Sequence, residues 1–205
     1  MRTPANGESG APSTADKSYA DRLSTLSGAR WKKILHVQAP FRAHIRHLAL
    51  GRTLDVGCGT GRNLHYLNKG SVGVDHNPFS IQTARDAGLT AYTSEEFFAT
   101  GATPLASFDS MLSAHVVEHL EPQEAIEILG SYVPYIKPGG KVVFITPQER
   151  GYASDATHVA FSDLVTLRKL SEQLGLRPAR AYSFPFPRFV GKFFTYNEFV
   201  HVSIV

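Results

Sequence analysis

Two histidines and a glutamate stand close together in the stretch SAHVVEHLEP, which spans residues 113–122. His115, Glu118 and His119 are spaced i, i+3 and i+4, so a helical backbone would place their side chains on one face. Two imidazoles and a carboxylate on one face can bind a divalent metal ion. The same residues are also typical of the ordinary first turn of a helix, and the elements around them must decide between the two interpretations.

The composition is that of a soluble globular protein with one domain. The 205 residues are enough for one full hydrophobic core and too few for two comfortable domains. No apolar run is long enough to span a bilayer, so we expect no membrane partner. The only cysteine, Cys58, excludes an intramolecular disulfide and fits a cytoplasmic location. The net charge of +3 is too small to require nucleic acid as a partner.

The first part of the chain differs from the rest in composition. Residues 1–17 are rich in Gly, Pro, Ser, Thr and Ala and lack the apolar region of a secretory signal, so we expect a disordered tail. Within residues 18–50 the apolar residues recur at helical intervals with a break near Pro40, which predicts cap helices. We expect residues 18–205 to form a single domain, with its core in residues 51–205.

Short apolar runs alternate with helical segments from residue 52 onward. The predicted strands are RTLDVGC, SVGVD, LTAYTS, FDSMLSA, KVVFITP and two more within residues 178–184 and 197–205. The predicted helices are RNLHYLNK, SIQTARDAG, EPQEAIEILGSY and FSDLVTLRKLSEQLGL, the last with Ser162 as a possible N-cap. This alternation predicts an α/β fold with a parallel sheet covered on both faces, whose ligands bind beyond the carboxyl ends of the strands.

The stretch LDVGCGTGRNL joins the first predicted strand to the segment after it through three glycines. Gly57, Gly59 and Gly61 let the backbone turn tightly and approach a ligand closely. The second predicted strand ends in Asp75, twenty residues after Asp55, where a carboxylate can accept hydrogen bonds from both hydroxyls of a ribose. A glycine loop followed by a strand-end acid favours a nucleoside ligand. The glycines alone do not exclude a dinucleotide.

Four stretches together resemble the successive motifs of the class I S-adenosylmethionine-dependent methyltransferases. They are LDVGCGTG, the acid in VGVDHNP, FDSMLSAHVVEHL and YIKPGGKVVFITP, and they follow the family's order over residues 52–147. The resemblance implies a doubly wound, Rossmann-like sheet of seven strands with an antiparallel last strand. It also implies S-adenosylmethionine as the cofactor and transfer of its methyl group to an acceptor.

The resemblance gives roles to residues near the first two strands. The three glycines would line the amino-acid part of the cofactor, and Asp55 would orient their loop or reach the methionine end through water. Asp75 would hold the ribose, and His76 would pack on the adenine.

Further roles fall on residues from three other parts of the chain. The candidates for contact with the adenine amine are Ser94, Glu95 and Phe97. Ser113 would face the methionine moiety. Gln38 or Arg42 would pair with the cofactor carboxylate, for which a guanidinium offers a bidentate fork; a solvated basic face is the alternative interpretation.

The same resemblance places HVVEH just past the fourth strand, beside the methyl group. Some members that methylate hydroxyls, those of the ubiquinone pathway and of small RNA, hold Mg²⁺ through a Glu-x-x-Glu-His run here, and the latter add a histidine downstream. The ligand set implied for this chain is His115, Glu118, His119 and His158. Imidazoles suit Mn²⁺, Fe²⁺, Co²⁺ or Zn²⁺ better than Mg²⁺. Alternatively the metal is absent and His115 acts as a base.

A divalent cation at this place favours oxygen as the methyl acceptor. It lowers the pKa of a bound hydroxyl and aligns it with the methyl group, and His115 or His158 can then take the proton. We therefore expect O-methylation of a small-molecule acceptor, such as a saccharide or a phenolic or polyketide metabolite. Ribose 2′-O-methylation of RNA, a cofactor-binding regulatory protein without activity, and a dinucleotide oxidoreductase are the alternatives. The acceptor pocket would use the N-terminal helices, the aromatic and basic segment 182–199 and, in a homodimer, a second subunit.

Overall fold

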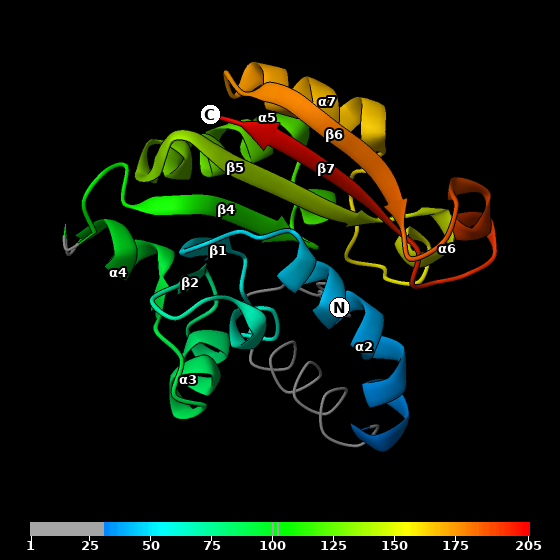
Figure 1. The fold of residues 1–205 in the computed structure, drawn as a ribbon, viewed down its shortest axis with the longest axis horizontal. Coiled ribbons are helices and arrows are strands. Elements are labelled where there is room, and N and C mark those ends of the chain that lie inside the picture. Colours follow the sequence, from blue (N-terminus) through cyan, green and yellow to red (C-terminus); the bar gives the residue numbers. More distant parts are fainter. Residues whose placement is uncertain (1–30, 100, 102) are drawn as a thin grey trace, which may run out of the picture.

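A seven-stranded sheet forms the centre of the protein (Figure 1). The computed structural model describes residues 31–205 except 100 and 102, with side chains from residue 39 onward, so the expected tail over residues 1–17 lies outside the described residues. The strands are β1 (Thr53–Val56), β2 (Val72–Asp75), β3 (Ala91–Thr93), β4 (Phe108–Ala114), β5 (Ile136–Pro147), β6 (Arg177–Phe184) and β7 (Glu198–Ile204).

Helices and short 3₁₀ turns connect these strands. The α-helices are α2 (Trp31–His47), α3 (Pro78–Asp86), α4 (Ser94–Ala99), α5 (Pro122–Tyr132), α6 (Glu149–Tyr152) and α7 (Leu164–Gln173). The 3₁₀ turns are η1 (Leu64–Tyr66), η2 (Val117–His119), η3 (Val133–Tyr135) and η4 (Arg188–Lys192). In the described part of the chain, no helix has both the length and the apolar character that a membrane span requires.

The strand order, β3-β2-β1-β4-β5-β7-β6, confirms the doubly wound sheet that the sequence predicts. Strands β1 to β5 pair in parallel, and β7 runs antiparallel to both β5 and β6. The chain moves outward from β1 to β3 and then returns to β4 on the other side of β1. This reversal puts the topological switch point at the carboxyl ends of β1 and β4, where ligands of such sheets bind.

Both faces of the sheet are covered, as a parallel sheet requires. On one face Leu129 of α5 and Leu167 of α7 pack with Met111 of β4. On the other face Ile45 of α2 packs with Leu112, the next residue of the same strand. Successive residues of β4 thus enter opposite cores, and Figure 1 shows α5 and α7 on one side of the sheet with α2 and α3 on the other.

Three local predictions from the sequence are wrong. RNLHYLNK forms only the single turn η1, which ends at Leu67 because the backbone there is extended. Helix α2 continues through Pro40, where a proline removes only one backbone donor. The N-cap of α7 is Asp163, whose carboxylate accepts from two backbone N–H groups of the first turn, and Ser162 instead donates to a backbone carbonyl.

Replacing Leu112 with Ala tests whether β4 is buried on the face of the sheet that α2 covers, as it is on the other face. Its side chain is fully buried, so the variant should lose about 2–5 kcal/mol of the free energy of unfolding. Leu105, which is 65% exposed, provides the control. Leu105→Ala should change the free energy of unfolding by less than about 0.5 kcal/mol. Urea denaturation measures both, and equal effects would contradict the packing described.

Candidate functional site

The glycine loop after β1 approaches open space at its middle glycine. The φ angles of Gly57, Gly59 and Gly61 are 76°, 53° and 84°, in the left-handed region that favours glycine. A Cβ on Gly57 would lie 2.1 Å from Val116, whereas a Cβ on Gly59 would meet no atom of the described residues within 4 Å apart from its chain neighbours. Gly57 is therefore needed for packing, and Gly59 leaves room for a ligand.

A buried carboxyl stands beside this loop at the end of β1. Asp55 is 1% exposed, and among the described residues its Oδ2 has no hydrogen-bond partner. Burial, followed by the negative charge of Asp75, raises the pKa of Asp55 to about 7, against the opposing charge of Arg62. Ser113, near the end of β4, likewise has a fully buried hydroxyl, and this hydroxyl has no hydrogen-bond partner among the described residues. Such groups are expected where a polar ligand completes the structure.

Asp75 ties the glycine loop to the end of β2. Its Oδ2 accepts a hydrogen bond of 2.8 Å from the backbone N–H of Gly59, and its Oδ1 accepts one of 2.8 Å from that of Asn77. Asn77 in turn caps α3, where its Oδ1 accepts from two backbone N–H groups of the first turn. A carboxylate has about four acceptor positions, so these bonds leave capacity for ribose hydroxyls.

A hollow of about 320 Å³ lies beside Asp75, between the ends of β2 and β3. His76, Pro78, Thr93, Ser94 and Glu95 line it. The structure therefore brings together three of the residues that the resemblance implies for the adenine, namely His76, Ser94 and Glu95. The other adenine candidate does not line this hollow.

That other candidate, Phe97, is buried in the core against Tyr132. The start of α4 is fixed by a reciprocal pair of bonds, in which Thr93 Oγ1 accepts from the N–H of Glu96 and the Glu96 carboxylate accepts from the N–H of Thr93. The Glu96 carboxylate is engaged in this capping box, whereas Ser94 and Glu95 line the hollow.

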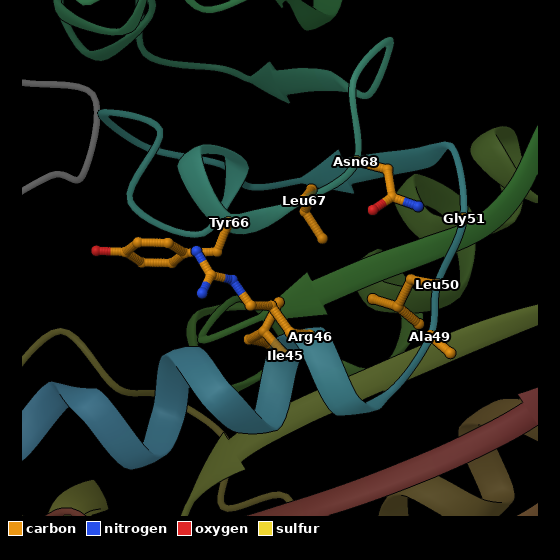
Figure 2. A pocket seen from close by; sticks show the side chains of 8 residues that line it. All are labelled: Ile45, Arg46, Ala49, Leu50, Gly51, Tyr66, Leu67 and Asn68. Carbon is orange, nitrogen blue, oxygen red and sulfur yellow. The ribbon is translucent and has the colours of Figure 1, made fainter.

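The N-terminal helix contacts the segment after the glycine loop. The guanidinium of Arg42 lies 5.6 Å from the ring centroid of Tyr66, and its pairing with a cofactor carboxylate stays a prediction. The side chain of Gln38 lies outside the described residues. A second hollow has a volume of about 70 Å³, and Gly51 forms part of its wall. Figure 2 shows Arg46 beside Tyr66 in this hollow. Gly51 precedes β1, so this hollow is at the amino ends of the strands, opposite the candidate site.

A cluster of potential metal ligands lies beyond the carboxyl ends of β4 and β5. One ligand atom each from Glu118, His119 and His158 lies within 4.8 Å of the others. HVVEH is not an α-helix: β4 ends at Ala114, and Glu118 and His119 belong to the 3₁₀ turn η2. The contact between the rings of His119 and His158, with centroids 4.7 Å apart, brings the downstream histidine to the motif.

Hydrogen bonds orient both histidines of this cluster. His119 Nδ1 lies 3.1 Å from the carbonyl oxygen of Thr157, and His158 Nδ1 lies 2.7 Å from that of Tyr152. A carbonyl only accepts, so in each neutral ring Nδ1 carries the proton and the lone pair of Nε2 is left for a cation. Burial lowers the pKa of His119 despite the nearby charge of Glu118, which favours this neutral form.

Glu118 completes the cluster with an oxygen that lacks a partner. The residue is fully buried, and its Oε2 has no hydrogen-bond partner within the described residues. Its Oε1 lies 3.2 Å from His115 Nδ1. An unpaired carboxylate oxygen in a buried position is unfavourable unless a cation or donor binds it.

His115 lies between two carboxylates and outside the cluster. Its Nε2 is 2.9 Å from Oε1 of Glu198, and its Nδ1 contacts Glu118. Burial alone would lower the pKa of His115, but the hydrogen bonds to both carboxylates and their charges raise it to about 9. A ring that donates from both nitrogens has no lone pair to bind a cation or to take a proton. The ligand and base roles expected for His115 stay predictions that this geometry does not favour.

The chain has recognisable relatives in sequence pattern and in fold. Residues 54–142 match the family model of a methyltransferase domain. An S-adenosylmethionine-dependent methyltransferase from Archaeoglobus fulgidus is 19% identical, with 93% of this chain and 100% of that chain covered and a TM-score of 0.67. One from Aquifex aeolicus is 22% identical, with 93% and 99% covered and a TM-score of 0.62. No curated protein matches the sequence.

A third structure has its cofactor bound. Magnesium protoporphyrin IX methyltransferase from Synechocystis, with bound S-adenosylmethionine, is 13% identical, with 93% of this chain and 92% of that chain covered and a TM-score of 0.62.

The family model thus identifies residues 54–142 as a methyltransferase domain, and the sheet around them has the class I fold. The family match supports S-adenosylmethionine as the cofactor, and the open space at Gly59 and the unpaired groups of Asp55 and Ser113 fit such a ligand. The order and spacing of the motifs in the sequence therefore predicted the family correctly.

Sequence reasoning missed two charged residues that act on side chains of the candidate site. Arg62 directly follows the last glycine of the loop, and its positive charge opposes the rise in the pKa of Asp55. A cation next to the glycines in GTGRNL was the sequence signal that could have indicated this role. Glu198 contacts His115 from the first position of β7. An acid at the start of the apolar run EFVHVSI was visible, but its partner is 83 residues away and depends on strand pairing.

Replacing Gly59 with Ala should weaken the binding of S-adenosylhomocysteine by roughly tenfold or more, about 1.4 kcal/mol, because the methyl group would occupy the space left for the ligand. Gly88, beyond the end of α3, is the matched control. Its φ is also positive, at 78°, and a Cβ there would likewise meet no described atom within 4 Å. Calorimetry should show unchanged affinity for Gly88→Ala, and equal losses in both variants would contradict the role of Gly59.

Replacing Asp55 with Asn tests its raised pKa through the pH dependence of stability. The pKa of about 7 in the folded state exceeds the usual value of 3.8, so between these values the folded state binds more protons than the unfolded state. The free energy of unfolding of the wild type, relative to that of Asp55→Asn, should therefore fall as the pH rises from about 4 to about 7. Urea denaturation without cofactor measures this difference.

Asp109→Asn is the control for this experiment. A hydrogen bond from Lys137, together with one from the backbone of Arg52, lowers the pKa of Asp109. Above its usual pKa this carboxyl is ionised in both the folded and the unfolded state, so the stability difference for Asp109→Asn should stay constant over the same range. A constant difference for Asp55→Asn as well would contradict the argument from burial.

Proposed function

We propose that this methyltransferase transfers the methyl group of S-adenosylmethionine to a hydroxyl oxygen of a small-molecule acceptor, with a divalent cation held by Glu118, His119 and His158. The single observation that carries the proposal is the convergence of these three ligands beyond the end of β4. The unpaired Oε2 of Glu118 and the carbonyl-bound Nδ1 atoms of both histidines support it, because both features leave ligand atoms available.

A cation here would answer the main chemical difficulty of O-methylation. The sulfonium is already a strong methyl donor, whereas an alcohol is a poor nucleophile because its pKa is high. A divalent cation held by Glu118, His119 and His158 would lower the pKa of a hydroxyl bound to it and would help to orient that hydroxyl toward the methyl group. The residues of the chain contribute by fixing the ligand atoms beside the switch point, where the cofactor binds.

The ligand set favours a transition metal over magnesium. Mg²⁺ prefers oxygen ligands, whereas two imidazoles and one carboxylate suit Mn²⁺, Fe²⁺, Co²⁺ or Zn²⁺. We therefore expect tighter binding of Mn²⁺ than of Mg²⁺.

Aromatic side chains between α2 and β6 suggest the class of acceptor. The ring of His44 stacks on Phe184 with centroids 4.0 Å apart, and Phe41 meets Phe184 edge to face. His44 Nε2 lies 2.6 Å from the hydroxyl of Tyr182. Phe184 ends β6 at the same edge of the sheet as the candidate site. Aromatic faces pack on planar or sugar rings, so we expect a phenolic or saccharide acceptor.

Metal titration tests the cluster. In the presence of S-adenosylhomocysteine, calorimetry should show saturable Mn²⁺ binding by the wild type that is lost in His119→Ala and in His158→Ala. His65, an exposed histidine of η1, provides the control, and His65→Ala should bind Mn²⁺ like the wild type. Failure of the wild type to bind Mn²⁺, Mg²⁺ and Zn²⁺ would refute the cation.

An acceptor screen tests the reaction type. The wild type is incubated with labelled S-adenosylmethionine, Mn²⁺ and a panel of catechols, saccharides, amines and carboxylic acids. We expect label on hydroxyl oxygen, with at least a roughly tenfold loss in His119→Ala or after chelation, the scale of effect typical of perturbed metal sites. Methylation of amines that is indifferent to chelation would refute O-methylation.

A further inference from the structure

Glu198 is linked to the ligand cluster through His115. The residue begins β7 and is 9% exposed, and its Oε1 lies 2.9 Å from His115 Nε2. The Nδ1 of the same ring lies 3.2 Å from Oε1 of Glu118. One imidazole thus bridges two carboxylates that are 80 residues apart in sequence.

A buried amide network fixes the start of β7. The side chain of Gln148 donates to the carbonyl oxygen of Glu198 over 2.9 Å, and Asn197 donates to Oε1 of Gln148 over 3.0 Å. Both amides are fully buried. Gly191 makes room for this network, since a Cβ there would lie 1.8 Å from Oε1 of Gln148. Glu198 is therefore held in place before any ligand binds.

The backbone of His115 supports the same arrangement. Its φ is +60°, a left-handed conformation that is uncommon for residues other than glycine. This conformation ends β4 and accompanies a side chain that contacts both carboxylates. Surrounding contacts must maintain such a conformation, and strained residues of this kind cluster at functional sites.

We infer that Glu198 is a positioning residue of the methyl-transfer site. By hydrogen-bonding Nε2 of His115, it holds the ring so that Nδ1 donates to Oε1 of Glu118. That bond fixes the rotation of the Glu118 carboxylate, and the buried Oε2 is then the oxygen presented to the cation. The metal part of this inference rests on the proposed function, whereas the chain of contacts from Glu198 to Glu118 does not.

The contact chain can be tested without metal. In protein labelled with ¹⁵N-histidine, the Nδ1–H proton of His115 should give a downfield resonance in the wild type, assigned by its loss in His115→Gln. Glu198→Ala should remove or shift this resonance. Glu198→Asp, whose shorter side chain does not reach the ring, should do the same. Glu198→Gln should retain it, because an amide can still hydrogen-bond Nε2. Glu149→Ala should leave the resonance unchanged, because it removes from helix α6 a carboxylate that pairs with Arg188 of η4.

Metal affinity provides the second readout. Relative to the wild type, Glu198→Ala and Glu198→Asp should bind Mn²⁺ roughly 10–100-fold more weakly, the usual effect of losing a group that orients a ligand. Glu198→Gln and Glu149→Ala should stay within about threefold of the wild type. Thermal denaturation confirms that each variant is folded.

The outcomes separate this inference from the proposed function. An unchanged His115 resonance in Glu198→Ala and Glu198→Asp would overturn the positioning role, and so would unchanged Mn²⁺ affinity in those variants. If Glu198→Ala does not fold, Glu198→Asp and Glu198→Gln decide by the same criteria. If the wild type binds no metal, the proposed cation fails, and the resonance alone decides whether Glu198 positions Glu118.

Discussion

A buried polar atom without a hydrogen-bond partner destabilises a fold by about 1–3 kcal/mol, and this protein holds several at one edge of its sheet. Among the described residues five buried side-chain atoms lack a partner, and three of them, on Asp55, Ser113 and Glu118, lie at or just beyond the carboxyl ends of β1 and β4. The pKa of Asp55 is raised chiefly for the same reason, since burial removes its carboxylate from water. A bound cofactor or cation would satisfy such groups, because it would supply the missing partners.

The topology of the sheet explains why these groups meet. The chain reverses its strand order between β1 and β4, so loops diverge there and leave room for a ligand. Because β7 runs antiparallel, its first residue reaches the edge at which the parallel strands end. Glu198 accordingly pairs with Pro147, the last residue of β5, and its side chain reaches His115. The antiparallel strand β7 therefore places the carboxylate of Glu198, its first residue, at the edge where the parallel strands have their last residues.

The sequence predicted the features that depend on local pattern. The strand over Phe108–Ala114, the glycine loop and Asp75 at the end of β2 were all predicted from neighbouring residues, and the grouping of Glu118, His119 and His158 followed from the resemblance to a family. The helical spacing of HVVEH was misleading, because the stretch turns sharply at His115 before the 3₁₀ turn. The contacts of His115 with Glu198, and of His119 with the carbonyl of Thr157, depend on tertiary packing. A contact with a backbone carbonyl cannot be predicted from residue types, because every residue has a carbonyl group.

The most direct test of the account is a crystal structure with S-adenosylhomocysteine and Mn²⁺, with data collected to locate manganese by its anomalous scattering. The account predicts an anomalous peak in contact with Glu118, His119 and His158, and the methionine end of the ligand beside Asp55 and Ser113. A structure in which the ligand is bound, Asp55 and Ser113 keep their unpaired atoms, and no peak lies at the three ligands would contradict it.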